Sequence, residues 1–441
     1  MTRRLGLLLS LAAALSALTI AGVIIDPPAV AGAAHVVKLG SLVILLCISG
    51  LVYFAAVALV LRNPWPKWTV WLVLGTAAAL RLMLLAVPPM LTTDIYRYVW
   101  DGRVQAQNIS PYRYIPADPA LAALRDRTVY PPVAEMVFAL AGRLWDDVNS
   151  FRLVALAFEA LGIGSLPLLL PLAGLPRERI LIYAWNPLAV WSFASDRHVD
   201  AIAVGFVGLA LLLRARHKDG WAGAALSTAV MAKFLPIVVA PALLRGGRFW
   251  RPAFAGLAVI LLGYAIYSGA GRHVLGFLPG YGAEEGLDSG QGFWLLAGLG
   301  DILPLPRSAS LLYAGLTILV FAATSIALLR RAPPENNAQR LCRDAGLLIG
   351  IALFAISPHY HWYFAWAALP AVVAHSPALL WLATAPLVLI IDPIGHSQFL
   401  WPSLIYVPAA ALLLLELCRQ RALPRPLPAQ SGDVSCPLQS H

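Results

Sequence analysis

Charged residues are scarce in this sequence. Only 12% of its 441 residues are Asp, Glu, Lys or Arg, and 60% are hydrophobic. A soluble domain has about 25% charged and about 45–50% apolar residues, so a chain with one water-facing surface is excluded. The apolar residues form blocks of roughly 15–25, and about 20 are needed to cross the ~30 Å of hydrocarbon in a bilayer. The scarcity of charge therefore predicts a protein that crosses a membrane many times.

Cysteines are also few, and they lack the spacing of a metal site or a disulfide framework. There are four: Cys47 falls within an apolar block, and the other three fall in segments expected in the cytoplasm. We therefore expect no metal and no other cofactor. The net charge of +10 does not indicate nucleic-acid binding, because the cytoplasmic loops of membrane proteins collect Lys and Arg. No internal repeat or coiled-coil heptad is evident.

The apolar blocks and basic loops predict an all-α, polytopic transmembrane helical bundle. We expect about 12–14 spans, some of them short or broken, in the cell membrane. Residues 1–423 form a single domain, with large extracytoplasmic loops at 88–150 and 269–308. Short helices are expected in these loops, and the polar segment 424–441 is expected to be a disordered cytoplasmic tail.

One apolar block conflicts with a simple crossing. Residues 221–244 have basic clusters at both ends, and both ends cannot be cytoplasmic if the segment crosses once. Two short helices that meet near Lys233, with Pro236 after the turn, resolve the conflict. Broken helices at membrane depth are tolerated where they line a cavity. Lys233 is expected to be partly buried, at the outer side.

The first outer loop begins with a segment that combines charge and helical spacing. Asp94, Arg97 and Asp101 lie near one face of a helix, and Thr93 is placed to cap it. Arg103 and further arginines in the loop oppose the usual preference for cytoplasmic cations, as a site for an anionic headgroup would require. A purely interfacial anchoring helix explains the spacing equally well.

Other polar residues have both functional and structural interpretations. His198 and Asp200 form a candidate metal pair, but two ligands are too few, and a hydrogen-bonded loop is favoured. His359 and His361 stand in an aromatic run at a helix junction, where an interfacial aromatic belt is the structural alternative. Arg81 lies within the third apolar block, where it faces either a cavity or Glu159 as an ion-pair partner.

The segment from Asp94 to Arg113 resembles the first outer loop of the bacterial GT-C membrane glycosyltransferases. The nearest in character are the polyprenyl-phosphate-mannose-dependent α-mannosyltransferases. Their loop opens with an acidic residue and continues through a Tyr-Arg-Tyr-type helix, Trp-Asp-Gly and an Asn-Pro-Tyr turn, which reads Ser110-Pro111-Tyr112 here. The resemblance extends with weaker motifs to about residue 375, through the segments 130–132, 185–187, 198–200, 233–236 and 357–362.

This resemblance implies a membrane hexosyltransferase that takes mannose from a polyprenyl-phosphate-sugar donor. The acceptor is a glycan or a lipid-linked sugar at the extracytoplasmic side, and Asp94 is the catalytic base. A departing phosphate needs no general acid, so one carboxylate is enough, and cations beside the phosphate stabilise the transition state. The candidate donor-phosphate and substrate-binding residues are Arg97, Asp101, Arg103, Lys233, His198, His359 and His361.

Two alternatives remain. A transporter or flippase for lipid-linked sugars shares the broken helices and buried charges, but it predicts repeated halves and polar residues at the bilayer midplane. A GT-C enzyme that transfers a pentose or an aminosugar is the other.

Overall fold

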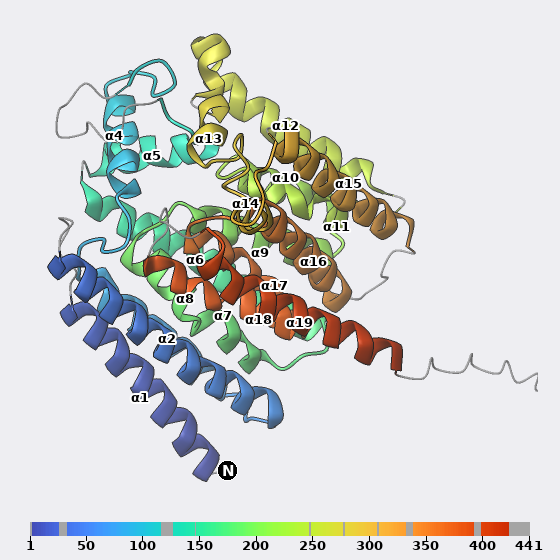
Figure 1. Ribbon diagram of the computed structural model, residues 1–441. Coiled ribbons are helices and arrows are strands. Elements are labelled where there is room, and N and C mark those ends of the chain that lie inside the picture. The colour runs from blue at the N-terminus through green and yellow to red at the C-terminus, as the bar shows by residue number, and fades with distance from the viewer. Residues whose placement is uncertain are drawn as a thin grey trace, which may run out of the picture.

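The computed structural model describes most of the chain, and every regular element in the described part is a helix (Figure 1). No strand occurs in these ranges, which confirms the all-α prediction. The predicted tail at 424–441 lies outside the described residues. Those residues are 2–25, 33–115, 127–145, 147–246, 248–276, 278–306, 308–331, 338–391 and 398–422.

Five described helices are long and apolar enough to cross a bilayer, and a sixth span results if one bent pair is counted as a unit. The bent pair joins α12 (Trp250–Ile266) to the segment Ser268–Ala283 at an angle of 109°. The five long helices are α1 (Thr2–Ile25), α2 (Ala33–Arg62), α6 (Val148–Leu172), α15 (Ser308–Arg330) and α19 (Leu400–Ala422). Shorter apolar helices lie among them.

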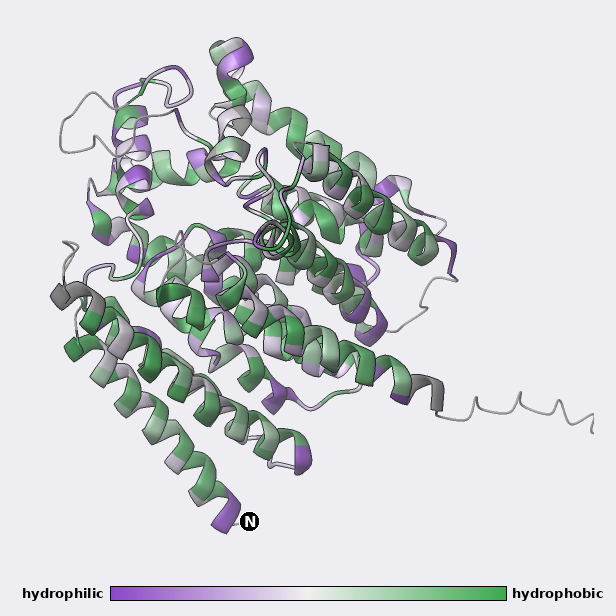
Figure 2. Ribbon diagram, in the orientation of Figure 1, coloured by the Kyte–Doolittle hydropathy of each residue, from purple (hydrophilic) through white to green (hydrophobic). Residues whose placement is uncertain are grey.

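The long helices present apolar side chains outward. On α15, Leu311, Leu312 and Leu319 are 75%, 72% and 67% exposed. Figure 2 shows the same hydrophobic colouring along α1, α2 and α15, with hydrophilic residues at the end of α2 and the start of α1. A surface of this kind is stable only in lipid, so the chain is a multi-pass membrane protein.

The other helices have 19 residues or fewer. They are α3 (Thr69–Leu85), α4 (Asp94–Ala106), α5 (Pro132–Leu144), α9 (Asp200–Ala215), α10 (Asp219–Val230), η5 (Ser268–Leu275), α13 (Leu278–Glu284), α14 (Trp294–Gly300), α16 (Ala338–Ile356), η6 (His361–Phe364), α17 (Ala365–Ala374), α18 (Pro377–Leu382) and η7 (Ala385–Ile391).

The apolar segment 177–195 does not form one helix and is broken into short turns. Asn186 interrupts it, because its side chain accepts a hydrogen bond from the Ala189 amide and so caps a new turn that begins at Pro187. The pieces are η2 (Arg177–Ile180), α7 (Leu181–Ala184), α8 (Pro187–Val190) and η3 (Trp191–Ser195), a π-helical turn.

The predicted break at Lys233 is confirmed. Helix α10 ends at Val230, and the chain resumes as η4 (Leu235–Val239) and α11 (Ala240–Leu244), with Pro236 in the first turn of η4. The Lys233 side chain is 14% exposed, so it is partly buried as expected.

Two close helix crossings hold the elements around this break. A Cβ on Gly102 of α4 would stand 2.4 Å from the carbonyl oxygen of Phe138 on α5, so only glycine fits. A Cβ on Gly205 of α9 would likewise stand 2.2 Å from the Phe158 carbonyl oxygen of α6. Small residues permit such contacts between helices in membranes. The crossings fix the positions of α4 and α9, the helices that begin at Asp94 and Asp200.

Arg81 forms an ion pair with Glu159, which was one of the two predictions for this residue. Its Nη2 atom lies 2.6 Å from Oε1 of Glu159, and Nη1 donates a hydrogen bond to the Ala184 carbonyl oxygen at 2.8 Å. Both side chains are buried, and a buried charge needs such a partner. The pair joins α3 to α6.

Candidate active site

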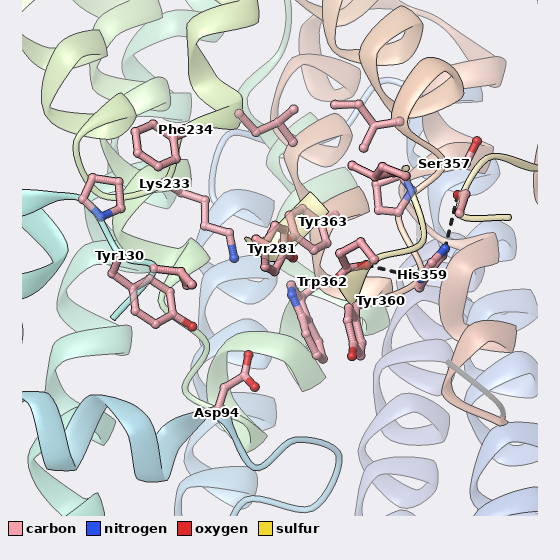
Figure 3. A pocket seen from close by; sticks show the side chains of 18 of the residues that line it. Asp94, Tyr130, Lys233, Phe234, Tyr281, Ser357, His359, Tyr360, Trp362 and Tyr363 are labelled. Carbon is pink, nitrogen blue, oxygen red and sulfur yellow. Dashed lines mark hydrogen bonds and ion pairs between the residues drawn. The ribbon is translucent and has the colours of Figure 1, made fainter. Parts of the chain in front are cut away.

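A cavity of about 530 Å³ opens where several helix ends meet (Figure 3). Its wall comes from the start of α4, the segment 127–131, the break after α10, the segment 281–292 and the junction 356–363. Figure 3 shows Asp94, Tyr130 and Lys233 turned toward one space, with Tyr360 and His359 on its other side. Segments far apart in the sequence therefore share one site.

Asp94 stands at the N-terminus of α4. Its backbone amide donates a hydrogen bond to the Thr92 hydroxyl at 3.1 Å. Thr93 occupies the N-cap position, but its side chain makes no capping hydrogen bond, so the prediction that Thr93 caps the helix was wrong. Thr93 has helical backbone angles instead of the extended ones of a capping residue. The Asp94 side chain is 38% exposed and lines the cavity.

Asp94 is the first of four side chains that form a continuous line of ion pairs and hydrogen bonds. Nε2 of His198 lies 3.1 Å from Oδ2 of Asp94, and Nδ1 lies 2.6 Å from Oδ2 of Asp200. Nζ of Lys233 lies 3.1 Å from the same Asp200 oxygen. The other oxygen, Oδ1, accepts a hydrogen bond from the Trp366 indole at 2.7 Å. Asp94, His198, Asp200 and Lys233, which we call the charge line, join α4, the segment before α9, α9 itself and the break after α10.

The local backbone explains how His198 reaches this position. After the π-helical turn η3, Arg197 adopts a positive φ of 56°, and the His198 amide donates to the Ser192 carbonyl oxygen at 3.1 Å. The His198 ring then stacks on Trp362, with ring centroids 4.2 Å apart. The ring is buried, and both of its nitrogens face carboxylates.

The electrostatics keep the exposed end of the line ionised. Burial raises the pKa of Asp94, but the hydrogen bond and charge of His198, together with Lys233, lower it more, so the pKa lies below its ordinary value. Burial lowers the pKa of His198, but Asp200 and Asp94 raise it more, so the pKa lies above its ordinary value. Asp94 is therefore a carboxylate, available to accept a proton in the cavity.

Cations and tyrosines occupy the wall near Asp94. Arg97 lines the cavity and is held by Asp101, whose Oδ2 lies 3.0 Å from Nε of Arg97. Lys233 lies 4.6 Å from the ring centroid of Tyr363 and 5.8 Å from that of Tyr130. This part of the wall suits an anionic ligand.

The opposite wall holds a contact between a histidine and a carboxylate. Nδ1 of His359 lies 3.2 Å from Oε2 of Glu285, and Nε2 is 3.2 Å from the Gly292 carbonyl oxygen. The Tyr360 ring stacks on Trp362 at 4.6 Å. The hydroxyls of Tyr281 and Tyr363 are hydrogen-bonded at 2.9 Å. Stacked aromatic rings beside polar groups suit the apolar face and the hydroxyls of a sugar.

The structure brings half of the predicted site residues to the cavity. Asp94, Arg97, Lys233 and His359 line it, whereas Asp101, Arg103, His198 and His361 do not. His361 is buried, and its Nε2 lies 3.8 Å from Oδ2 of Asp196. His198 and Asp200 lie in a hydrogen-bonded loop, in which the Asp200 amide nitrogen lies 3.5 Å from Nδ1 of His198, as was favoured over a metal pair. Within the described ranges, no three His, Cys, Asp or Glu side chains converge on a metal position.

Sequence reasoning missed several lining residues. Tyr130 was noted only as part of the segment 130–132 in the resemblance, and Tyr281 and Glu285 were not singled out at all. Tyr360, Trp362 and Tyr363 belong to a run that was noted only as a whole. A tyrosine near a carboxylate in a Gly-rich segment was the signal available for residues 281–285.

The described helices make the chain an integral membrane protein, and its family match makes it a glycosyltransferase. The family model described as the N-terminal domain of alpha-(1->6)-mannopyranosyltransferase, the MptA/B family, matches residues 3–245, and the chain belongs to this family. The matched region contains the whole charge line, but it ends before Tyr281, Glu285 and the run 359–363. No curated protein and no solved structure matched the chain.

Proposed function

We propose that the protein transfers mannose from a polyprenyl-phosphate-mannose donor to a glycan or lipid-linked acceptor at the extracytoplasmic face, with inversion, and that Asp94 is the general base. The observation that carries the proposal is the Asp94 carboxylate, which is ionised and exposed in a cavity with cations beside it.

The reaction needs few groups. The acceptor hydroxyl oxygen attacks C1 of the mannose, the bond from C1 to the phosphate oxygen breaks, and the phosphate leaves with the electron pair. Asp94 takes the hydroxyl proton. Attack opposite the leaving group converts a β-linked donor into an α-linked product. A glycosidase, in contrast, needs two carboxyl groups.

Two features of the wall suit a lipid-linked phosphate donor. Lys233, Arg97 and Arg127 line the cavity and stabilise the charge that grows on the departing phosphate. Ile237 and Ile356 also line it, and their side chains are 52% and 41% exposed. Their exposed apolar surface suits an isoprenoid chain.

Transfer is tested with the purified protein in nanodiscs, a radiolabelled polyprenyl-phosphate-mannose donor and an α-mannoside acceptor. We expect a new α-linked mannose, and Asp94→Asn lowers the rate by about 10²–10⁴-fold, the usual contribution of a general base. Asp301→Asn, which alters an exposed carboxylate of the second outer loop, retains the wild-type rate. Donor movement across the membrane without a new glycosidic bond would instead identify a flippase.

The orientation is tested by labelling. Tyr114 is 56% exposed in the first outer loop. A cysteine introduced by Tyr114→Cys reacts with a membrane-impermeant maleimide in intact cells if the cavity faces outward. Reaction only after the cells are opened would contradict the extracytoplasmic assignment.

A further inference from the structure

His198 is in an unusual position for a histidine. Its ring is fully buried, and each of its nitrogens faces a carboxylate oxygen, of Asp94 at 3.1 Å and of Asp200 at 2.6 Å. A neutral imidazole carries one N–H, so one nitrogen lone pair would face an oxygen lone pair. An imidazolium places its positive charge between the two carboxylates, within 3.1 Å of an oxygen of each. Its stacking on Trp362 at 4.2 Å also favours the cationic form.

Asp200 holds His198 from the side away from the cavity. Nζ of Lys233 lies 3.1 Å from Oδ2 of Asp200, and the Trp366 indole donates a hydrogen bond to Oδ1. Asp200 is fully buried, whereas Asp94 is partly exposed. Both ends of the charge line, Asp94 and Lys233, therefore reach the cavity, whereas His198 and Asp200 are buried between them.

The proposed donor creates an electrostatic problem at the Asp94 end of the charge line. Its phosphate is anionic and must lie close to Asp94 for the sugar to react. A neighbouring negative charge makes a carboxylate easier to protonate, and a protonated Asp94 is no longer a base. Lys233 shares its charge with Asp200, so it offsets only part of this effect. A further cation in contact with Asp94 is needed, and His198 is in that place.

We propose that His198 is a positioning residue that carries a proton on both ring nitrogens and holds the Asp94 carboxylate oriented and ionised while the donor phosphate is bound. This inference rests on the proposed function, since it assigns a role within the same site. His198 does not line the cavity and acts only through Asp94. The raised pKa of His198 and the lowered pKa of Asp94 agree with it.

The charged and titratable groups around the pair come from every element packed against it. They are Asp200 and Lys233 in the charge line, Asp196 and His361 beside His198, Tyr98 and Tyr130 next to the Asp94–His198 contact, and Arg97 on the cavity wall. The pKa of His361 is lowered to about 3 by burial, so His361 is neutral and does not replace the charge of His198.

The pH profile of kcat/KM tests the inference. In His198→Gln, the amide still donates one hydrogen bond to Asp94 but carries no charge. We expect its acid limb to move upward by at least one pH unit, with much of the lost activity recovered at high pH. A rate lowered by the same factor at every pH would show a merely structural role and overturn the proposal.

His361→Gln is the matched control, because it also removes a buried imidazole, but one that faces Asp196 instead of Asp94. Its acid limb stays at the wild-type pH even if its rate falls. The proposed function fails separately, if the wild-type protein transfers no mannose or if Asp94→Asn retains full activity.

A measurement on the wild-type protein keeps the proposal testable if His198→Gln does not fold. A non-reactive phosphodiester analogue of the donor, with 2-deoxy-2-fluoromannose, does not titrate near neutral pH. Calorimetry in buffers of different ionisation enthalpy counts the protons taken up when it binds. We expect none between pH 6 and pH 7. Uptake of about one proton would mean that Asp94 becomes protonated, which contradicts the proposal.

Discussion

Helix α4 carries two aspartates that sequence spacing treats as equivalent, and the structure gives them opposite environments. Asp94 is 38% exposed in the cavity, and its pKa is lowered by His198 against the effect of burial. The Asp101 side chain is fully buried against Arg97, and its pKa is raised because burial outweighs the charge of Arg97. Asp94 and Asp101 are seven positions apart in the sequence. Asp94 is open to a ligand, whereas Asp101 holds helices together. Helical spacing identifies candidate catalytic carboxylates, but the side chain that contacts each carboxylate determines its role.

The closed cluster around Asp101 is built for packing. Gln105 of α4 donates from Nε2 to Oε2 of Glu135 on α5 at 2.8 Å, and the Thr128 hydroxyl donates to Oε1 at 2.5 Å. Tyr267, just after α12, donates to Oε1 of Gln105 at 2.8 Å. These hydrogen bonds join α4, α5 and the end of α12. Arg97 belongs to this cluster and also lines the cavity.

The largest expected difference is between variants that remove the Asp101 carboxylate and the Asp94 carboxylate. Asp101→Ala removes the carboxylate that pairs with the buried guanidinium of Arg97, so the free energy of unfolding falls by about 3–5 kcal/mol. Asp94→Asn changes it by less than about 1 kcal/mol, as expected for a partly exposed group, while activity is lost. Denaturant unfolding in detergent measures both. Equal destabilisation by the two variants would show that Asp94 and Asp101 contribute equally to the stability of the fold.

The next contrast concerns the cation of the charge line. Lys233→Met removes a charge beside the departing phosphate, so kcat/KM falls by about 10²-fold. Lys233→Arg keeps the charge and recovers part of this loss. Steady-state transfer rates with varied donor concentration give the values, and an unchanged rate in Lys233→Met would exclude Lys233 from the reaction.

A smaller effect is expected where α4 crosses α5. Gly102→Ala forces the helices apart at Phe138, costs about 1–3 kcal/mol of stability and moves Asp94. Gly164→Ala on α6, where no atom lies within 4 Å of the added Cβ, is the control and gains up to about 1 kcal/mol. Melting temperature and turnover are measured together. Wild-type turnover in Gly102→Ala would show that the crossing does not position the base.

The smallest effect is expected at Glu135. Burial first, and then the charge of Asp101, raise its pKa well above 4.5, so the folded protein binds this proton more tightly than the unfolded chain does. The stability that this proton contributes is fully present below about pH 4.5 and is lost as the pH rises through the raised pKa. Glu135→Gln keeps a neutral side chain, so at pH 5 its stability lies within about 1 kcal/mol of wild type.

Melting temperature as a function of pH checks this prediction. The wild-type value should fall relative to that of Glu135→Gln as the pH rises above 5. Parallel curves would mean that Glu135 is ionised in the folded protein.

The sequence-based predictions succeeded where a local pattern was decisive. Basic clusters on both sides of one apolar block were enough to place the break at Lys233, and the composition was enough to predict an all-helical membrane protein. Asp94 and Arg97 were placed on one helix face by their spacing. The charge line was not predictable, because 104 residues separate Asp94 from His198, and their contact depends on a π-helical turn and on Trp362. Arg103 was selected for its charge alone, and it does not reach the cavity.

The pairing of Lys233 with Asp200 has a consequence for biogenesis. Each residue alone would oppose entry of its segment into lipid, since an isolated charge there costs several kcal/mol. The two segments, α9 and α10, follow each other directly in the chain and pack together. The opposite charges can meet as soon as this hairpin leaves the ribosome, so the pair enters the bilayer as one neutral unit.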